Sequence, residues 1–350
     1  MDHVELTAEL TPLRTWQTGL GALAIEPKLP LPRDRDRDWV AQWLQKLLAD
    51  PSRELLQRPS HQFRAQLVRI GFHLGGGQDT EWNAVQGGLC ADAMEYLHMG
   101  SLIVDDIQDG SEFRRNGPAL HCTLGTPHAL AVGNWLYFHA LSLLDRLELP
   151  ATAQLGLVRA FHRLVELAHY GQALDVCVKV DANLEPAELV ALSEACLHYK
   201  TGAIVALALV MGACLAQANP ERINAIEHLG LALGAYLQRY NDVGNLLGAF
   251  DPDKKWEDLL GRKPSYVWVL LVETYGPEGL RSFQQAFAKL PDERALQTWM
   301  QERGFAQAAK QRIEAAFDQA LTDFTETTKM PLRDLKTLLT LKERIQKAYV

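Results

Sequence analysis

Apolar residues recur at intervals of three and four over most of the chain. One such series runs through Leu157, Phe161, Leu164 and Leu167. This spacing places apolar side chains along one face of an α-helix. Alternating runs of β-branched and polar residues, the usual sign of strands, do not interrupt these series. We therefore predict an all-α fold of roughly ten or more helices packed around a buried core.

Proline, glycine and asparagine mark the predicted loops. Residues 27–38 combine three prolines with alternating charges and are predicted to form a linker or an extended arm. We expect an N-terminal extension over residues 1–40 and a single all-helical domain over residues 41–350. Further breaks are predicted at residues 75–77, 149–150, 219–220, 249–256 and 276–277.

Composition and charge narrow the classes of function. Hydrophobic residues make up 47% of the 350 residues and charged residues 22%, which is the balance of an ordinary globular domain. The formal net charge of −8 gives no electrostatic reason to expect nucleic acid as a partner. The first ten residues are acidic and lack the basic-then-apolar order of a signal peptide.

The cysteines and the most apolar segment favour a cytoplasmic protein. Five cysteines are scattered along the chain without Cys-x-x-Cys spacing, which favours reduced thiols over disulfides or a zinc site. Residues 203–218 form the most apolar stretch, but a membrane span needs roughly 20 such residues. We expect this stretch to be a buried core helix, and we expect no stable membrane insertion.

Two of the predicted core helices carry polar clusters whose burial is costly without a partner. The first helix leads into Asp105, Asp106 and Asp109. Asp105 and Asp109 are one helical turn apart and share a face, so their charges repel unless a cation lies between them. Oxygen ligands favour Mg²⁺, which also coordinates substrate phosphates. Alone, an Asp-Asp-x-x-Asp sequence is weak support, since acidic groups also cap helices.

An arginine pair follows the acidic cluster and strengthens this interpretation. Arg114 and Arg115 can supply bidentate ligands to the opposite side of a bound diphosphate. Loss of diphosphate from an allylic carbon produces a carbocation, which needs a dry apolar cavity to survive. The acidic and basic clusters together predict magnesium-assisted diphosphate chemistry.

The segment from Glu95 to Arg115 resembles the first aspartate-rich region of the trans-prenyl diphosphate synthases. Its matching residues are Glu95, His98, Ser101, Leu102, Asp105, Asp106, Asp109, Arg114 and Arg115. Further matches follow in the family's order at Gly171, Gln172, Asp175, Tyr199, Lys200, Thr201, Gly202, Gln238, Lys254, Asp258, Leu259, Gly261, Arg262 and Lys263. The resemblance implies an all-α isoprenoid synthase-type helical bundle around a central cavity, usually as a homodimer.

The resemblance also implies where an allylic prenyl diphosphate would bind. Asp105, Asp106 and Asp109 would bind the Mg²⁺ that bridges this diphosphate. Arg114, Lys200 and Lys263 would contact this diphosphate as well, and Lys254 is a further matching residue that would bind substrate.

A second set of matches implies the site of isopentenyl diphosphate and the reacting region. Arg64, His98 and Arg115 would bind isopentenyl diphosphate. The catalytic residues implied by the resemblance are Lys200, Thr201 and Gln238, of which Thr201 and Gln238 can stabilise the cation through their dipoles.

The second aspartate-rich motif of the family is altered in this chain. Where the family has Asp-Asp-x-x-Asp, residues 241–245 read Asn-Asp-Val-Gly-Asn. Asn241, Asp242 and Asn245 are the expected metal ligands, and the loss of two charges predicts weaker metal binding. The altered motif also resembles the Asn-Asp-x-x-Ser-x-x-x-Glu motif of terpene cyclases, with Asn245 and Ala249 in place of Ser and Glu.

The family's Gly-Gly-Lys-x-x-Arg loop aligns with residues 59–64, of which only Arg64 is retained. His61 stands in place of the lysine. A histidine is mostly neutral at pH 7 unless a phosphate raises its pKa, so we expect a poorer anion ligand. This change leaves the identity of the second substrate open.

Two small residues bear on product length. In the family, residues four and five before the first aspartate face down the cavity, and here they are Ser101 and Gly100. Small residues leave the cavity open, with Leu97 or Tyr96 as its floor, so we expect a C20 or somewhat longer product. The alternative is that Gly100 and Ser101 only allow close packing of helices.

Three functions remain open from sequence. The first is a prenyltransferase that condenses an allylic diphosphate with isopentenyl diphosphate. The second keeps the ionisation step but cyclises the cation, as a class I terpene cyclase does, or transfers it to another acceptor. The third is a non-catalytic subunit of a heteromeric prenyl synthase. A requirement for isopentenyl diphosphate separates the first from the second.

Overall fold

The structure is a computed structural model that describes residues 34–58, 63–181, 184–248 and 255–349. His61 and Lys254, both predicted to bind substrate, lie outside the described residues. The first half comprises α1 (Asp34–Leu44), η3 (Gln45–Ala49), α2 (Asp50–Gln57), α3 (Phe63–Leu74), η4 (Asp79–Glu81), α4 (Ala84–Asp109), β1 (Phe113–Arg114), β2 (Gly117–Pro118), α5 (Leu120–Leu124) and α6 (Thr126–Leu144). The second half comprises α7 (Ala151–Cys177), α8 (Pro186–Cys196), η5 (Leu197–Gly202), α9 (Ala203–Leu215), α10 (Pro220–Leu247), α11 (Glu257–Leu260), α12 (Tyr266–Phe287), α13 (Arg294–Glu302), α14 (Phe305–Thr328), η7 (Leu332–Leu335) and α15 (Lys336–Tyr349).

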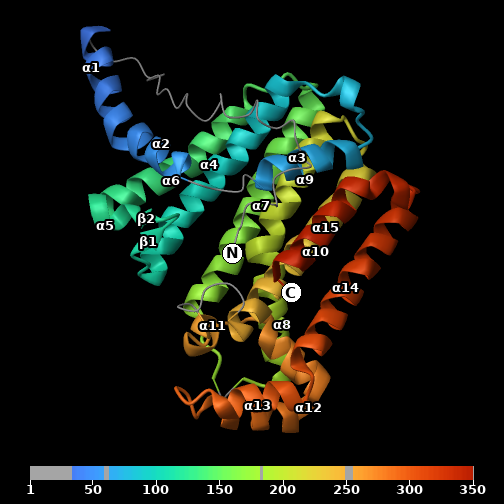
Figure 1. Cartoon of the computed structure of the whole chain (residues 1–350). Coiled ribbons are helices and arrows are strands. Elements are labelled where there is room, and N and C mark those ends of the chain that lie inside the picture. Colours follow the sequence, from blue (N-terminus) through green and yellow to red (C-terminus); the bar gives the residue numbers. More distant parts are fainter. Residues whose placement is uncertain (1–33, 59–62, 182–183, 249–254, 350) are drawn as a thin grey trace.

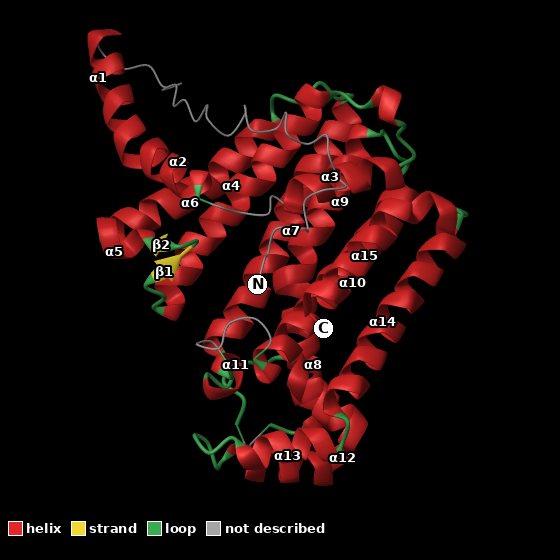
Figure 2. Ribbon diagram, viewed as in Figure 1, coloured by secondary structure: helices red, strands yellow, loops and turns green. Residues whose placement is uncertain are grey.

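Helices form nearly all of the described structure, as Figures 1 and 2 show. Within the described ranges, the strands β1 and β2 form a single two-stranded antiparallel hairpin, which directly follows α4. The predicted all-α fold is confirmed. α1 begins at Asp34, two residues after Pro32, so residues 34–38 of the predicted arm are helical, because the charged residues that follow Pro32 do not prevent a helix.

The core is built around α9, the most apolar helix. Eleven of its 13 residues are buried, and it packs against α3, α7 and α10. The helical run from Pro186 to Leu215 is long and apolar enough to cross a membrane, but 67% of its most apolar window is buried inside the bundle. The segment therefore occupies the place expected of a core helix.

The last helix, α15, is held to the bundle by a polar network centred on Glu314 of α14. Lys342 Nζ lies 2.9 Å from Glu314 Oε2, and the hydroxyl groups of Tyr236 and Tyr240 on α10 donate to Oε1 at 2.8 and 2.5 Å. Burial alone would raise the pKa of Glu314, but these hydrogen bonds, with one from Gln346, lower it to about 2. The network joins three helices that are separated in sequence.

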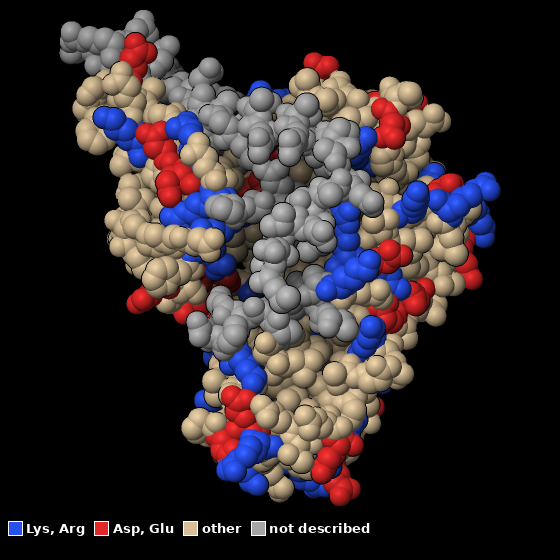
Figure 3. Space-filling model, viewed as in Figure 1, with Lys and Arg blue, Asp and Glu red and all other residues tan. Residues whose placement is uncertain are grey.

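The face of the molecule in Figure 3 carries basic and acidic residues interspersed over its described parts. α4 packs against α6, and α7 and α10 both pack against α9 and η5, while α12 and α13 lie at one end of the bundle in Figure 1. The functional residues predicted on α4, α7 and α10 consequently face a common interior.

Candidate active site

A cavity of about 780 Å³ lies between the helices. Along α4 its lining runs from Leu97 to Asp109, and along α7 it runs from Val165 to Cys177. The charged and amide side chains that line it are Arg64, Asp105, Gln108, Asp109, Gln172, Asp175, Lys200, Gln238, Asn241, Asp242, Asp258 and Lys263. The apolar lining includes Leu67, Leu97, Leu102, Val165, Ala168, Ile204, Val205 and Leu237. Charged side chains are therefore concentrated near the ends of α4 and α7, and apolar side chains line the rest of the cavity.

The acidic cluster occupies the last turn of α4. Asn83 caps the start of this helix, and Gly110 ends it in the left-handed conformation at φ 67°. Carboxylates near a helix C-terminus are unfavourable, because that end carries partial negative charge. Asp105, Asp106 and Asp109 therefore need positive partners from elsewhere in the fold.

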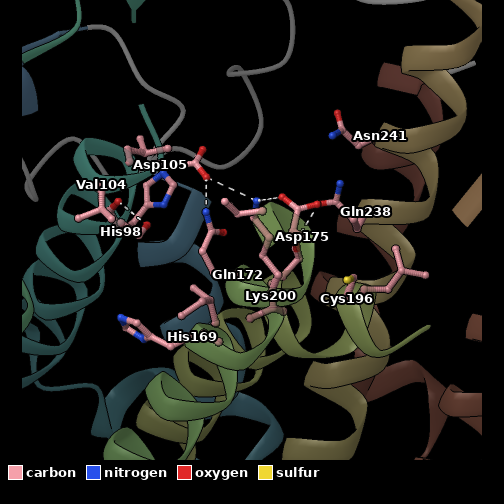
Figure 4. A pocket seen from close by; sticks show the side chains of 18 of the residues that line it. His98, Val104, Asp105, His169, Gln172, Asp175, Cys196, Lys200, Gln238 and Asn241 are labelled. Atoms are coloured by element: carbon pink, nitrogen blue, oxygen red, sulfur yellow. Dashed lines mark hydrogen bonds and ion pairs between the residues drawn. The ribbon is translucent and has the colours of Figure 1, made fainter. Parts of the chain in front are cut away.

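Asp105 and Asp109 obtain such partners inside the cavity. Asp105 Oδ1 accepts a hydrogen bond from Gln172 Nε2 at 2.7 Å and lies 3.5 Å from Lys200 Nζ. Lys263 Nζ lies 3.5 Å from each carboxylate oxygen of Asp109. Figure 4 shows Asp105, Gln172 and Lys200 converging on one region of the pocket.

Asp106 faces the opposite way. Its side chain is almost fully buried, it is not part of the cavity lining, and its carboxylate accepts hydrogen bonds from Nε and Nη2 of Arg114. Burial raises the pKa of Asp106, and the Arg114 guanidinium opposes that effect. The structure thus brings together a predicted metal ligand and a predicted diphosphate ligand as an ion pair.

Lys200 lies at the centre of the charged region. Its Nζ is 2.6 Å from Asp175 Oδ2, and Lys263 Nζ is 3.9 Å from the same oxygen. Burial alone would lower the pKa of Lys200, but the charges of Asp175 and Asp105 raise it above its ordinary value. The ammonium group stays protonated at neutral pH. Asp175 was matched in the sequence without a role, and the structure makes it the shared partner of both lysines.

Local backbone geometry directs Lys200 and Thr201 into the cavity. Both residues belong to η5, a π-helical stretch between α8 and α9, and such stretches alter the direction of side chains at functional sites. A Cβ on Gly171 would lie 2.2 Å from the backbone nitrogen of Lys200. Only glycine permits this close approach of α7 to η5.

A hydrogen-bond chain links η5 to α10. Thr201 Oγ1 donates to Gln238 Oε1 at 2.7 Å, and Gln238 Nε2 donates to Asp242 Oδ1 at 2.7 Å. The other oxygen of Asp242 accepts the backbone N–H of Tyr266 at 2.7 Å. Thr201 and Gln238, predicted as catalytic, are thereby fixed beside one another at the cavity wall.

The three expected ligands of the second motif lie in different environments. Asn241 is exposed and lines the cavity, whereas Asp242 is buried with both oxygens hydrogen-bonded. Burial and the neighbouring Asp258 raise the pKa of Asp242. Asn245 is not part of the cavity lining, and its Oδ1 lies 3.4 Å from the backbone N–H of Asp258.

The donor set fits a hard cation at Asp105 and Asp109. Both side chains offer only oxygen, and Mg²⁺ commonly binds one or two carboxylates together with waters and substrate phosphates. Among the described residues, no group of three or more His, Cys, Asp and Glu side chains is close enough to hold an ion unaided.

The predicted isopentenyl diphosphate ligands form a second, more basic group. Burial lowers the pKa of Arg64 to about 10, with Glu95 opposing and Arg115 adding to the effect. Burial and the charges of Arg64, Arg115 and Arg114 lower the pKa of His98 well below its ordinary value, so its imidazole is neutral at pH 7. The charges of Arg64 and Arg115 thus act on His98, and Arg64 and His98 line the cavity, whereas Arg115 is not part of its lining.

The residues predicted to control product length separate into two pairs. Ser101 and Leu97 line the cavity, whereas Tyr96 contacts the ring of His139 at a centroid distance of 5.3 Å and is not part of the lining. A Cβ on Gly100 would lie 2.8 Å from the carbonyl oxygen of Gly133 on α6. Gly100 therefore serves the close crossing of α4 and α6, and Ser101 alone of these two small residues faces the interior.

Comparison with known proteins agrees with this fold and site. The sequence matches the polyprenyl synthetase family over residues 45–302, and the chain therefore belongs to that family. The prediction of a prenyltransferase of the trans-prenyl diphosphate synthase class is confirmed at the level of the family.

Individual relatives carry names consistent with that family. The chain is 29% identical over 232 residues to a geranylgeranyl pyrophosphate synthase of Eremothecium gossypii, covering 65% of this chain and 70% of the relative. It is 27% identical over 209 residues to a short chain isoprenyl diphosphate synthase of Methanothermobacter thermautotrophicus, covering 60% of this chain and 61% of the relative. A crystal structure of a geranylgeranyl pyrophosphate synthase superposes with a TM-score of 0.74 at 20% identity, covering 95% of this chain and 96% of the other, which establishes the shared fold.

Proposed function

We propose that the protein condenses an allylic prenyl diphosphate with isopentenyl diphosphate, in a reaction that requires Mg²⁺. The observation that carries this proposal is the cavity, in which Asp105 and Asp109 face Lys200 and Lys263 above an apolar depth. Carboxylates and lysines around one space suit a metal-bound diphosphate, and the apolar part of the cavity suits a hydrocarbon chain.

Each charged group has a distinct task in this proposal. Asp105 and Asp109 hold Mg²⁺, which supplies charge neutralisation to the departing diphosphate. Lys200 and Lys263 bind the same diphosphate as permanent cations, since the carboxylates that now contact them also keep their pKa values above the ordinary range. These contacts orient the allylic carbon over the apolar depth and exclude water from it.

The second substrate, isopentenyl diphosphate, binds to the basic group of residues in this proposal. Arg64 and Arg115 bind isopentenyl diphosphate through charge-assisted hydrogen bonds, and neutral His98 adds a donor without further charge. The Thr201 hydroxyl group and the Gln238 carboxamide are hydrogen-bonded to one another and line the same cavity. Their dipoles stabilise the allylic cation while it forms the new bond.

A C20 or somewhat longer product is proposed from two observations. Ser101 leaves the wall of the cavity open, and the relatives with the names reported above include a geranylgeranyl pyrophosphate synthase. Among the lining residues of α4, Leu97 is the farthest along the helix from Asp109, and it is proposed as part of the floor.

We also propose a homodimer located in the cytoplasm. Phe138 on α6 and Tyr170 on α7 are 74% and 53% exposed, and they follow directly after Tyr137 and His169, whose rings are in contact. Exposed aromatic residues on two neighbouring helices suit an interface between copies. The five cysteines are all free thiols, in keeping with a reducing compartment. Phe138→Asp is expected to convert a dimer to a monomer in light scattering.

The test of the main proposal is product analysis with Mg²⁺ and geranyl, farnesyl or geranylgeranyl diphosphate, each with and without isopentenyl diphosphate. Longer diphosphates formed only when isopentenyl diphosphate is present would support elongation and report the product length. Hydrocarbons or alcohols formed without it would contradict elongation.

Formation of hydrocarbons or alcohols without isopentenyl diphosphate would indicate the main alternative function. The altered second aspartate-rich motif is the observation that favours this alternative. Asn241 and Asn245 lack the charge of the family's aspartates, and both oxygens of Asp242 are already hydrogen-bonded within the protein. In this alternative the same ionisation is followed by cyclisation or by transfer to another acceptor. A non-catalytic subunit would instead show no turnover alone and would co-purify with a second synthase chain.

A further inference from the structure

The hairpin after α4 holds Arg115 in an unusual backbone conformation. Phe113 pairs with Pro118 and Arg114 pairs with Gly117, which leaves Arg115 and Asn116 as a two-residue turn. Both turn residues have positive φ, at 51° and 60°. Turns of this kind prefer Asn-Gly or Gly-Gly, because a β-carbon is strained in the left-handed region. Asparagine tolerates this conformation, but arginine does not favour it.

Strained residues persist where the surrounding structure holds them in place. Here the surrounding group is Arg58, which follows α2 and contacts both strands of the hairpin. Its Nη1 donates to the carbonyl oxygen of Arg114 at 2.7 Å and to that of Pro118 at 2.9 Å. The turn is thus bridged by one guanidinium group.

Arg58 is itself fixed on its other side. Its Nε and Nη2 donate to the two carboxylate oxygens of Glu54 at 3.0 and 3.1 Å, one helical turn earlier. The Arg58 side chain is only 12% exposed, whereas that of Glu54 is 59% exposed, so solvent competes weakly at the arginine end of these bonds. The guanidinium therefore has a single well-defined position.

Gly117 provides the space for this arrangement. A Cβ at residue 117 would lie 2.8 Å from Arg58 Cζ and 2.9 Å from Nη1. Gly117 does not have a positive φ, so its backbone would accept alanine without strain. Glycine is therefore needed at position 117 to leave room for the Arg58 guanidinium, and not because of the backbone conformation of the turn.

We propose that Arg58 is a positioning residue, which holds Arg115 in its left-handed conformation so that the Arg115 guanidinium can bind a diphosphate. The inference rests on the proposed function, because it assigns Arg115 to the isopentenyl diphosphate site. Arg58 does not line the cavity and acts through the hairpin.

The experiment compares Arg58→Ala, Gly117→Ala, the double variant and Arg58→Ala/Asn116→Gly in the full chain. Arg53→Ala, which removes another ion-paired arginine of α2, is the matched control. Arg58→Ala and Gly117→Ala are each expected to raise KM for isopentenyl diphosphate about tenfold, with KM for the allylic substrate unchanged within about twofold. Gly117→Ala retains the Arg58 charge but displaces it, so equal effects of the two variants identify positioning rather than direct anion contact.

Two further comparisons separate positioning from a general loss of stability. The double variant is expected to be no worse than Arg58→Ala, because the new methyl group then has room. Asn116→Gly is expected to recover part of the loss in Arg58→Ala, since glycine lowers the cost of the turn. Additive losses in the double variant, or a normal KM in Gly117→Ala, would overturn the proposal.

Amide hydrogen exchange provides a readout that does not depend on turnover. The Ala119 N–H donates to the Glu112 carbonyl oxygen at 2.8 Å and closes the hairpin. Its exchange is expected to accelerate about tenfold in Arg58→Ala and Gly117→Ala but not in Arg53→Ala. Unchanged exchange would overturn the positioning role. If the wild-type chain does not consume isopentenyl diphosphate, the proposed function fails, whereas hydrogen exchange and calorimetric binding of inorganic pyrophosphate still decide the role of Arg58.

Discussion

The guanidinium of Arg114 holds the buried carboxylate of Asp106, with 2.8 Å between Nε and Oδ1. This ion pair divides the acidic cluster at the end of α4 into two functional parts. Asp105 and Asp109 face the cavity, whereas Asp106 fixes the hairpin that carries the arginine pair.

Asp106→Asn is expected to lower the free energy of unfolding by about 3 kcal/mol, because Arg114 loses its buried partner. The double variant Asp106→Asn/Arg114→Gln is expected to regain part of this stability without regaining activity. Urea unfolding of the three proteins measures the difference. A fully stable Asp106→Asn variant would show that the ion pair has no structural role.

Asp105→Asn is expected to behave differently. Its unfolding free energy is expected to stay within about 1 kcal/mol of wild type, since its contacts with Lys200 and Gln172 lie in the polar part of the cavity. Turnover with Mg²⁺ is expected to fall about 100-fold or more. Steady-state kinetics at saturating Mg²⁺ tests this, and a normal rate would refute the assignment of Asp105 to the metal.

The second motif offers a matched pair of substitutions. Asn241→Asp adds a carboxylate to the cavity lining and is expected to lower the Mg²⁺ concentration for half-maximal activity about three- to tenfold. Asn245→Asp adds the same charge outside the lining and is expected to leave this concentration unchanged. Magnesium titrations of both variants make the comparison, and equal effects would contradict their different placement.

Product length is expected to respond to Ser101 and not to Gly100. Ser101→Phe adds a ring to the cavity wall and is expected to shorten the product by at least one isoprene unit while the melting temperature changes little. Gly100→Ala forces α4 and α6 apart and is expected to cost about 1–3 kcal/mol of stability without a shorter product. Chromatography of the dephosphorylated products and thermal unfolding decide between them.

The attachment of α15 is expected to depend on pH through Glu314. Because its folded-state pKa is lowered to about 2, its contribution to stability is present above the ordinary glutamate pKa and is lost as pH falls towards 2. Wild type is expected to exceed Glu314→Gln by about 1 kcal/mol at pH 7, after allowance for solvent screening, and by less at pH 3. Unfolding of both proteins at the two pH values tests this, since other groups cancel in the difference. A gap that widens at pH 3 would contradict it.

Helical periodicity was sufficient to predict the all-α fold, because most helices bury one regular apolar face. Asp105, Asp109, Lys200 and Lys263, which the resemblance assigned to one diphosphate, line one cavity in the structure. It assigned Asp106 to the metal alone, because spacing on one helix does not reveal where a following hairpin returns.

Glycine roles were the least predictable part of the site. Gly100 and Gly117 both contact distant segments, at Gly133 and at Arg58, and such contacts depend on how elements far apart in sequence cross. Asp175 and Arg58 have no acidic or basic cluster around them in the sequence that would set them apart. Their roles arise from the lysines and carbonyl groups that the fold brings to them.

The glycine contact between α7 and η5 has a consequence for how the cavity can be filled. With Gly171 already against the backbone of Lys200, and Gly100 against Gly133 of α6, the elements on either side of each contact cannot move closer together. For an enzyme of the proposed function, a growing chain must then extend along the helix axes rather than widen the space between them. The depth of such a cavity would then set the length of the product. Selection for a different product would act on the few side chains that project across the long axis of the cavity.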